Sequence, residues 1–225
     1  MKIFDQILGH ENIIERLLYA YQNQKLGSVY LFIGPSGVGK KKVALGLAQA
    51  LVCEQNQRGC GICPSCLRVA QRQSESLILI EPEGPQIKVE QAHEVLKFLS
   101  LKPMGKSAVV VIDQAHLMNQ QSANMLLKAL EEPAQDVYFI LLTSSYSALL
   151  PTIRSRGQVV RFGPLSEDQI RKNSPQSPLW AIRAARGSFE RLTELSHIED
   201  QELRQKAAQI LLDLVEDEDF LMNEN

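Results

Sequence analysis

The stretch LFIGPSGVGKKKVA, residues 31–44, constrains the fold of this chain more than any other part of its sequence. It places a run of apolar residues before a glycine-rich loop and a segment of helical character after it. Residues 34–40 fit the pattern G-x-x-x-x-G-K, in which backbone N–H groups and a lysine surround phosphate oxygens. A chance glycine turn would not need a strand before it and a helix after it. The stretch therefore predicts an α/β fold with a phosphate site at the end of a strand.

Segments of strand and helix character alternate along the first 162 residues. Both are recognised by the spacing of their apolar residues. Strands are expected at residues 28–33, 76–82, 107–113, 136–145 and 157–162, and helices at 11–24, 38–53, 89–102 and 119–133. Because strands that are joined through helices run parallel, we predict a five-stranded parallel sheet with helices on both faces.

The composition changes after residue 162, where a polar, proline-bearing segment begins. Helical periodicity returns at residues 179–198 and again at 199–219, and the acidic end of the chain is expected to be disordered. We predict three parts: a core at residues 1–162, a reduced helical part at 163–197, and a helix with an acidic tail at 198–225.

The composition is that of an ordinary globular protein, with 44% hydrophobic residues, 22% charged residues and a net charge of −2. This charge argues against a free-standing nucleic-acid-binding protein, which is usually basic. No stretch approaches the roughly 20 apolar residues of a membrane span, and the first residues lack the features of a signal peptide. We therefore expect a cytoplasmic protein with no membrane partner.

Two residues near the phosphate loop, Lys41 and Gln114, are unusual for an enzyme that hydrolyses a nucleotide. Lys41 stands where such a loop normally has Ser or Thr, whose hydroxyl binds magnesium. Asp113, at the end of a buried strand, has the usual place of the acidic residue that holds magnesium, and the alternative that it only caps the next helix stays open. Gln114 follows it, and an amide is not a useful base at pH 7. We expect phosphate binding with weakened or lost hydrolysis.

The expected ligand is ATP or ADP, and magnesium is a doubtful one. The residues expected to hold the nucleotide are Gly34, Pro35, Ser36, Gly37, Val38, Gly39, Lys40, Lys41 and Asp113.

All four cysteines of the chain, Cys53, Cys60, Cys63 and Cys66, fall within one short window. In a reducing compartment this spacing is more typical of a metal site than of disulfide bonds. Four thiolates with no open position suit structural zinc. Free thiols and a redox C-x-x-C pair stay open as alternatives. We predict a zinc module at residues 53–66 that stabilises a loop too small to have a core of its own.

The motifs and their order resemble a known family. The glycine loop, the cysteine module, VVVIDQAHLMNQQSANMLLKALEEP and LLTSSYSALLPTIRSRGQ follow one another as in the AAA+ subunits of the bacterial sliding-clamp loader. Among these, the sequence looks most like the delta prime subunits of DNA polymerase III. The resemblance covers residues 1–162 closely and 163–197 loosely. It implies an AAA+ P-loop NTPase core with a zinc-binding insertion and a small helical lid, and it marks residues 198–225 as the start of a collar domain.

The resemblance also implies roles for residues outside the phosphate loop. Thr143 or Ser144 matches the position that senses the γ-phosphate. Arg156 matches the arginine of the family's Ser-Arg-Cys motif, which acts in trans as an arginine finger on ATP bound to a neighbouring subunit. Without the resemblance, Arg156 would be interpreted as a surface arginine. Gly157 replaces the cysteine of the motif, and Glu190 sits where an ATPase subunit would place an arginine.

These features predict a delta prime-type subunit of the DNA polymerase III clamp loader that hydrolyses little or no ATP itself. It would supply Arg156 to a neighbouring subunit while a sliding clamp is loaded during DNA replication. The expected partners are the other loader subunits, the sliding clamp and, through the assembly, primed DNA. Two alternatives stay open: a catalytically active, gamma/tau-like ATPase subunit, and a zinc-stabilised scaffold that binds no nucleotide.

DNA binding by the chain itself is a weaker expectation. Scattered lysines are usually just a solvated surface. The candidate DNA contacts are Lys88, Lys97, Lys102 and Lys106.

Overall fold

The computed structural model describes residues 1–101, 105–195 and 207. The chain forms two compact units, residues 1–164 and 165–225. The first unit holds the sheet and both candidate sites. Among its described residues, the second unit holds three short helices. No helix in the described part of the chain combines the length and the apolar character needed to cross a membrane.

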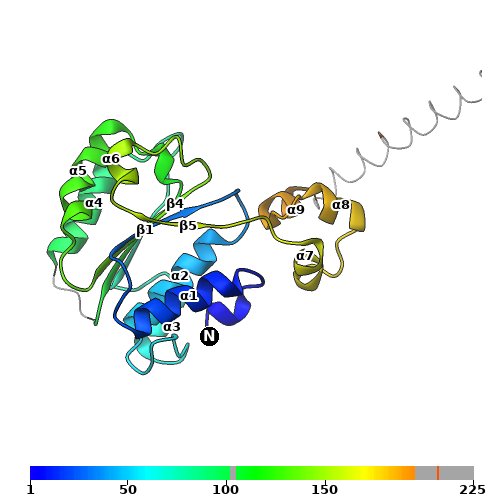
Figure 1. Cartoon of the computed structure of the whole chain (residues 1–225), viewed down its shortest axis with the longest axis horizontal. Coiled ribbons are helices and arrows are strands. Elements are labelled where there is room, and N and C mark those ends of the chain that lie inside the picture. The colour runs from blue at the N-terminus through cyan, green and yellow to red at the C-terminus, as the bar shows by residue number, and fades with distance from the viewer. Residues whose placement is uncertain (102–104, 196–206, 208–225) are drawn as a thin grey trace, which may run out of the picture. The chain divides into compact units, whose positions relative to one another are not determined.

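The first unit is built on a five-stranded sheet in which all neighbouring strands run parallel, as predicted (Figure 1). The strand order is β2-β3-β4-β1-β5. The strands are β1 (Val29–Ile33), β2 (Leu77–Ile80), β3 (Ala108–Ile112), β4 (Val137–Thr143) and β5 (Gln158–Arg161). Every residue of β1 and β3 is buried, in agreement with their uninterrupted apolar sequences. Since the strands are parallel, the loops that follow β1, β3 and β4 lie at the same edge of the sheet.

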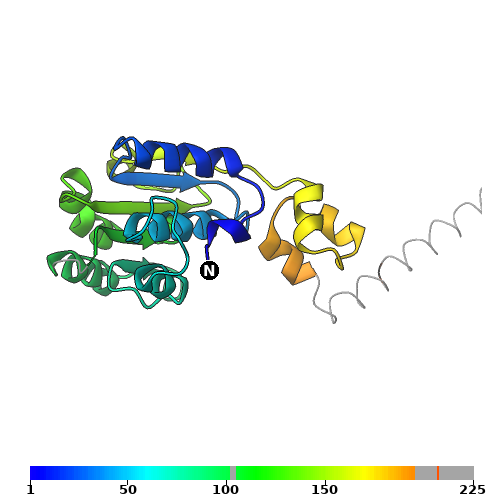
Figure 2. The same ribbon diagram turned by 90° about the horizontal axis from the view of Figure 1, so that it is seen from below.

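Helices cover both faces of the sheet (Figures 1 and 2). One face packs against α1 (Glu11–Gln22), α2 (Lys40–Val52) and α3 (Pro64–Ala70), and the other against α4 (Val89–Ser100), α5 (Gln120–Glu131) and α6 (Pro151–Arg154). Alternate side chains of one strand enter opposite cores: Phe32 of β1 packs on the α2 side and Leu31 on the α5 side. Two short 3₁₀ turns, η1 (Phe4–Gln6) and η2 (Ala115–Leu117), complete this unit.

The second unit contains α7 (Glu167–Asn173), α8 (Leu179–Ala184) and α9 (Phe189–Leu195). Leu165, Ile170, Ile182, Leu192 and Leu195 form its small apolar core.

Several local features differ from the expectations. The helical periodicity of residues 179–198 is split into α8 and α9, because Arg186 and Gly187 have φ of 49° and 83° and cannot continue a helix. α7 lies in the polar, proline-bearing segment after residue 162, where no individual helix was predicted, and it begins at a capping box between Ser166 and Gln169. Neither α3 nor α6 was predicted. The helix predicted for 199–219 and the acidic tail lie outside the described residues, apart from residue 207.

Gly157, which replaces the cysteine of the family motif, leaves no room for a side chain. A Cβ atom there would lie 2.4 Å from Cγ of Leu31, a fully buried residue of β1. We predict that Gly157→Cys lowers the free energy of unfolding, measured in urea, by about 1–3 kcal/mol, because the core must shift to admit the side chain.

The cost of Gly157→Cys should shrink when Leu31 is also replaced by Ala, since the two side chains compete for one space. Gly163→Ala is the control, because a Cβ atom at Gly163 meets nothing within 4 Å. This control should change the free energy of unfolding by less than about 0.5 kcal/mol. Equal stability of the Gly157→Cys and unchanged chains would contradict the prediction.

Candidate nucleotide and metal sites

The phosphate loop joins Ile33 at the end of β1 to Lys40 at the start of α2. Gly37 and Gly39 have φ of 72° and 106°, a region that side chains other than glycine rarely adopt. Position 34 has no room for a side chain, since a Cβ atom on Gly34 would lie 2.3 Å from the backbone oxygen of Phe162. The loop therefore turns tightly at the N-terminal end of α2, where backbone N–H groups and the helix dipole favour an anion.

The ammonium group of Lys40 folds back onto this loop. Nζ donates hydrogen bonds to the carbonyl oxygens of Gly34, at 2.7 Å, and Pro35, at 2.6 Å. The residue is only 9% exposed. Its charge is therefore held inside the curve of the loop, where a bound phosphate would compete with the two carbonyl oxygens for the same N–H donors.

The ammonium group of Lys41 forms ion pairs with two carboxylates. Its Nζ lies 2.5 Å from Oδ2 of Asp113, which follows β3, and 2.6 Å from Oε1 of Glu81, which follows β2. Burial alone would lower the pKa of Lys41, but the hydrogen bonds to Asp113 and Glu81 outweigh it and raise this pKa above its usual value. Lys41 in turn lowers the pKa of Glu81. Lys41 and Glu81 are therefore charged at neutral pH.

These residues do not fit the magnesium ion that P-loop NTPases use. The hydroxyl ligand is absent, because Lys41 takes its place in the sequence. Both oxygens of Asp113 are engaged: Oδ2 pairs with Lys41, and Oδ1 accepts a hydrogen bond of 2.9 Å from the backbone N–H of Gln114. The Gln114 side chain is exposed. A charged ammonium cannot be a metal ligand, and it repels a cation brought near Asp113.

Thr143 and His116 form a contact beside the same carboxylate. Oγ1 of Thr143 lies 3.0 Å from Nδ1 of His116 and accepts a hydrogen bond of 3.0 Å from the backbone N–H of Ser145. Thr143 is buried, whereas Ser144 is exposed. Of the two expected sensor residues, Thr143 is therefore the one in contact with the loop after β3.

No role was predicted for His116, because only its position three residues after Asp113 distinguishes it in the sequence. Burial, and then the nearby charge of Lys40, lower the pKa of His116 below its usual value. The imidazole is therefore neutral at pH 7. It stands among Lys40, Asp113 and Thr143 as an uncharged hydrogen-bonding group.

Arg156 is held by groups of its own chain. Its guanidinium pairs with the carboxylate of Glu131 at the end of α5 and donates to the carbonyl oxygen of Thr152 and to Oγ of Ser155. Its Nε is buried without a hydrogen-bond partner, and 26% of its side chain is exposed. None of these contacts involves the phosphate loop, so the guanidinium is fixed in place without serving the nucleotide site of its own chain.

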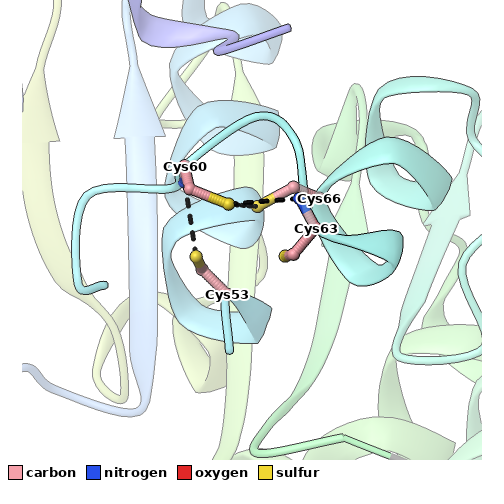
Figure 3. A group of neighbouring side chains, drawn as sticks. All are labelled: Cys53, Cys60, Cys63 and Cys66. Carbon is pink, nitrogen blue, oxygen red and sulfur yellow. Dashed lines mark hydrogen bonds between the residues drawn. The ribbon is translucent and has the colours of Figure 1, made fainter. Parts of the chain in front are cut away.

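The four cysteine side chains converge on one point (Figure 3). Cys53 directly follows α2, Cys60 lies in the loop, Cys63 precedes α3, and Cys66 lies on α3. All four Sγ atoms lie within 4.8 Å of one another, and those of Cys60 and Cys66 are 3.9 Å apart. In a tetrahedral zinc site with Zn–S bonds of about 2.3 Å, the sulfur atoms are about 3.8 Å apart. The donor set therefore fits a metal ion of this kind.

Backbone N–H groups are directed at the sulfur atoms. Sγ of Cys53 accepts hydrogen bonds from the backbone of Asn56, at 3.4 Å, and Cys60, at 3.3 Å. Sγ of Cys60 accepts one of 3.2 Å from Cys63. Although burial opposes it, backbone hydrogen bonds of this kind hold the pKa values of Cys53, Cys60 and Cys63 below that of an ordinary thiol. Burial raises the pKa of Cys66. Three of the four groups are thus prepared to act as thiolates.

A buried amide attaches the cysteine module to the rest of the unit. Nε2 of Gln49 on α2 donates hydrogen bonds of 3.0 Å to the carbonyl oxygens of Met1 and Cys66. Its Oε1 accepts one of 2.9 Å from the backbone N–H of Ile3. Gln49 is 1% exposed. This side chain therefore links the N-terminal segment, α2 and the module.

Comparison with known proteins decides the family. Residues 9–166, well over half of the chain, match the family described as "DNA polymerase III, delta subunit". The chain belongs to this DNA polymerase III subunit family. The predicted resemblance to a clamp-loader subunit is confirmed.

Curated relatives include both kinds of AAA+ subunit. The tau/gamma subunit of Haemophilus influenzae is 36% identical over 172 residues, covering 75% of this chain and 25% of the relative. The tau subunit of Escherichia coli is 32% identical, covering 83% of this chain and 31% of the relative. The delta prime subunit of Pseudomonas aeruginosa is 36% identical over 132 residues, covering 56% of this chain and 40% of the relative. The chain thus spans less than half the length of these relatives.

Solved structures identify the fold. A gamma subunit-related protein of Thermotoga maritima superposes with a TM-score of 0.55 at 21% identity, over 80% of this chain and 56% of that chain. The RuvB Holliday junction branch migration motor of T. maritima superposes with a TM-score of 0.54 at 18% identity, over 87% of this chain and 63% of that chain. The predicted AAA+ P-loop fold is therefore confirmed.

Within this family member, the lysines considered for DNA contact have varied surroundings. Nζ of Lys106 donates to the carbonyl oxygens of Cys53 and Glu54, both at 3.2 Å, and so supports the cysteine module. Lys88 pairs with Glu83 at 3.1 Å. Lys97 is exposed, and Lys102 lies outside the described residues. In the second unit, Glu190 is exposed on α9.

Loss of one thiolate should release the metal and destabilise the core unit. We predict that purified chain contains about one zinc ion and that Cys63→Ser contains almost none, measured by elemental analysis. Its melting temperature should fall by roughly 6–12 °C, the equivalent of about 3 kcal/mol for a domain of this size.

Ile62→Ser is the matched control, since Ile62 lies in the same loop, is 70% exposed and has no ligand atom. It should keep both the metal and the melting temperature. Metal-free wild-type chain with an unchanged melting temperature would contradict the prediction.

Proposed function

We propose that this chain is a delta prime-type subunit of the DNA polymerase III clamp loader that hydrolyses little or no ATP. The observation that carries the proposal is the ion pair of Lys41 with Asp113, 2.5 Å long, at the place where an ATPase of this fold would hold magnesium. Gln114 adds to it, because its amide cannot accept a proton from an attacking water at pH 7.

Arg156 would act on a neighbouring subunit. Its guanidinium is planar and permanently charged, as an arginine finger requires, and Glu131 holds it at a fixed position. The negative charge of ATP on an adjacent subunit would compete with Glu131 for this group. The chain would then complete an active site that it does not itself contain, while the assembly opens a sliding clamp for loading onto primed DNA.

The remaining site residues have supporting roles in this proposal. The loop residues Gly34 to Lys40 bind the phosphates of ATP or ADP, and Thr143 with His116 contacts the outer phosphate. Cys53, Cys60, Cys63 and Cys66 bind a structural zinc ion that fixes the loop between α2 and α3. The partners are the other loader subunits and, through the assembly, the clamp and DNA.

A second candidate function is that of an active, gamma/tau-like ATPase subunit. The supporting observation is the 36% identity to a tau/gamma subunit over 75% of this chain. In that case Asp113 would leave Lys41 to bind a metal ion when nucleotide is present. The two functions differ in whether the chain alone turns over ATP.

Replacing Arg156 tests the role in trans. In a reconstituted loader, Arg156→Ala should slow ATP hydrolysis at the neighbouring subunit's site by about 10³-fold or more. The clamp-dependent ATP turnover of the whole loader should therefore fall by at least the fraction that this site contributes. Arg156→Lys should not restore the rate, because the planar fork is lost.

Arg154→Ala is the matched control for Arg156. Arg154 lies over the ring of Tyr146, 5.4 Å from its centroid, and should not affect turnover. Size-exclusion chromatography would first establish that every variant assembles. Unchanged turnover with Arg156→Ala in an assembled loader would reject the role.

Turnover by the purified chain separates the two candidate functions. We predict no ATP hydrolysis above background with magnesium present, and no effect of Asp113→Asn, since Asp113 is occupied by Lys41. Phosphate release measured over hours gives sufficient sensitivity. Steady magnesium-dependent turnover that Asp113→Asn abolishes would instead establish the active ATPase.

A further inference from the structure

The cluster of Lys41, Glu81 and Asp113 is complete without a metal ion. The ammonium group lies within 2.6 Å of one oxygen of each carboxylate. Arg72 lies 3.8 Å from Glu81, so two cations face two carboxylates. The three central groups come from the start of α2, directly after the phosphate loop, and from the ends of β2 and β3.

The ammonium group of Lys41 takes the place that magnesium has in a P-loop NTPase. In a magnesium-dependent P-loop site the metal lies between the residue after the loop lysine and the acidic residue after the strand. Here those residues are Lys41 and Asp113, and they contact each other directly. A divalent cation placed between them would have to displace the ammonium from Asp113 and would be repelled by it.

The ammonium group of Lys41 is also a candidate contact for a phosphate. Lys41 has three N–H donors, of which the two carboxylates use two. Its side chain is 33% exposed, and it is next in sequence to Lys40, whose ammonium lies inside the loop. Lys40, Lys41 and the N-terminus of α2 together provide positive charge for a polyphosphate that carries no metal.

We propose that Lys41 replaces magnesium as a fixed cation, so that the loop binds the polyphosphate of a nucleoside di- or triphosphate in its metal-free form. This inference rests on the proposed function in one respect, namely that the site binds a nucleotide without hydrolysing it. The bound nucleotide would then be a structural part of the subunit and would be insensitive to magnesium.

The test is a fluorescence titration of the full chain with N-methylanthraniloyl-ADP, in EDTA and in millimolar magnesium. The dissociation constants of the wild-type chain in the two buffers should agree within about twofold. Lys41→Thr restores the hydroxyl and removes the ammonium, so it should bind weakly in EDTA and at least about tenfold more tightly with magnesium. Lys42→Thr, which changes an exposed lysine one residue further on, should behave as the wild type.

A second measurement does not depend on the folding of Lys41→Thr. ADP in EDTA should raise the melting temperature of the wild-type chain as much as ADP with magnesium does, and electron paramagnetic resonance should detect no manganese bound to the wild-type chain with ADP. Nucleotide binding that disappears in EDTA, or no binding in either buffer, would overturn the inference. Neither result affects the test of Arg156 in the loader, and a failure of Arg156 to act in trans would leave the titration unaffected.

Discussion

Burial of α2 is the constraint on which both candidate sites depend. Of its 13 residues, 11 are buried, whereas an amphipathic surface helix buries only the residues of one face. The helix begins at Lys40, directly after the phosphate loop, and Cys53 directly follows its last residue. Its side chains pack with those of β1, β3 and β4 in one apolar core, so neither end can move without opening that core. A helix of this length, about 20 Å, therefore sets the separation of the nucleotide and metal sites.

The sequence at the N-terminus of α2 is electrostatically unfavourable. Lys40, Lys41 and Lys42 form its first turn, where the helix dipole favours negative rather than positive charge. Two sets of contacts offset these positive charges. Carbonyl oxygens of the loop accept hydrogen bonds from Lys40, and the carboxylates of Asp113 and Glu81 form ion pairs with Lys41. Removal of one partner of such a half-buried pair leaves the other uncompensated. The ion pairs thus stabilise a helix start whose local sequence is unfavourable.

The elements that could be predicted from the sequence are those with strong local signals. The strands β1 to β4 were recognised because each contains a short apolar run, and the cysteine cluster because its four members fall within one short window of the sequence. The Lys41–Glu81 pair was missed because it joins positions 40 residues apart, and their proximity depends on the place of β2 at the end of the strand order. His116 was missed for the same reason, since its partner Thr143 is on β4. α6 is four residues long, which is too short for a repeating helical pattern of apolar residues to be recognised.

Similarity to relatives does not separate a hydrolysing from a non-hydrolysing subunit. Strands and helices make up more than half of residues 9–166, and their apolar faces are required for the sheet whichever reaction occurs. The distinction lies in the chemistry of a few side chains. With a pKa raised by two carboxylates, Lys41 keeps its proton and cannot become a metal ligand at neutral pH. The amide of Gln114 cannot serve as a base at any physiological pH. These two properties favour a non-hydrolysing subunit even though tau/gamma subunits match more of the chain than a delta prime subunit does.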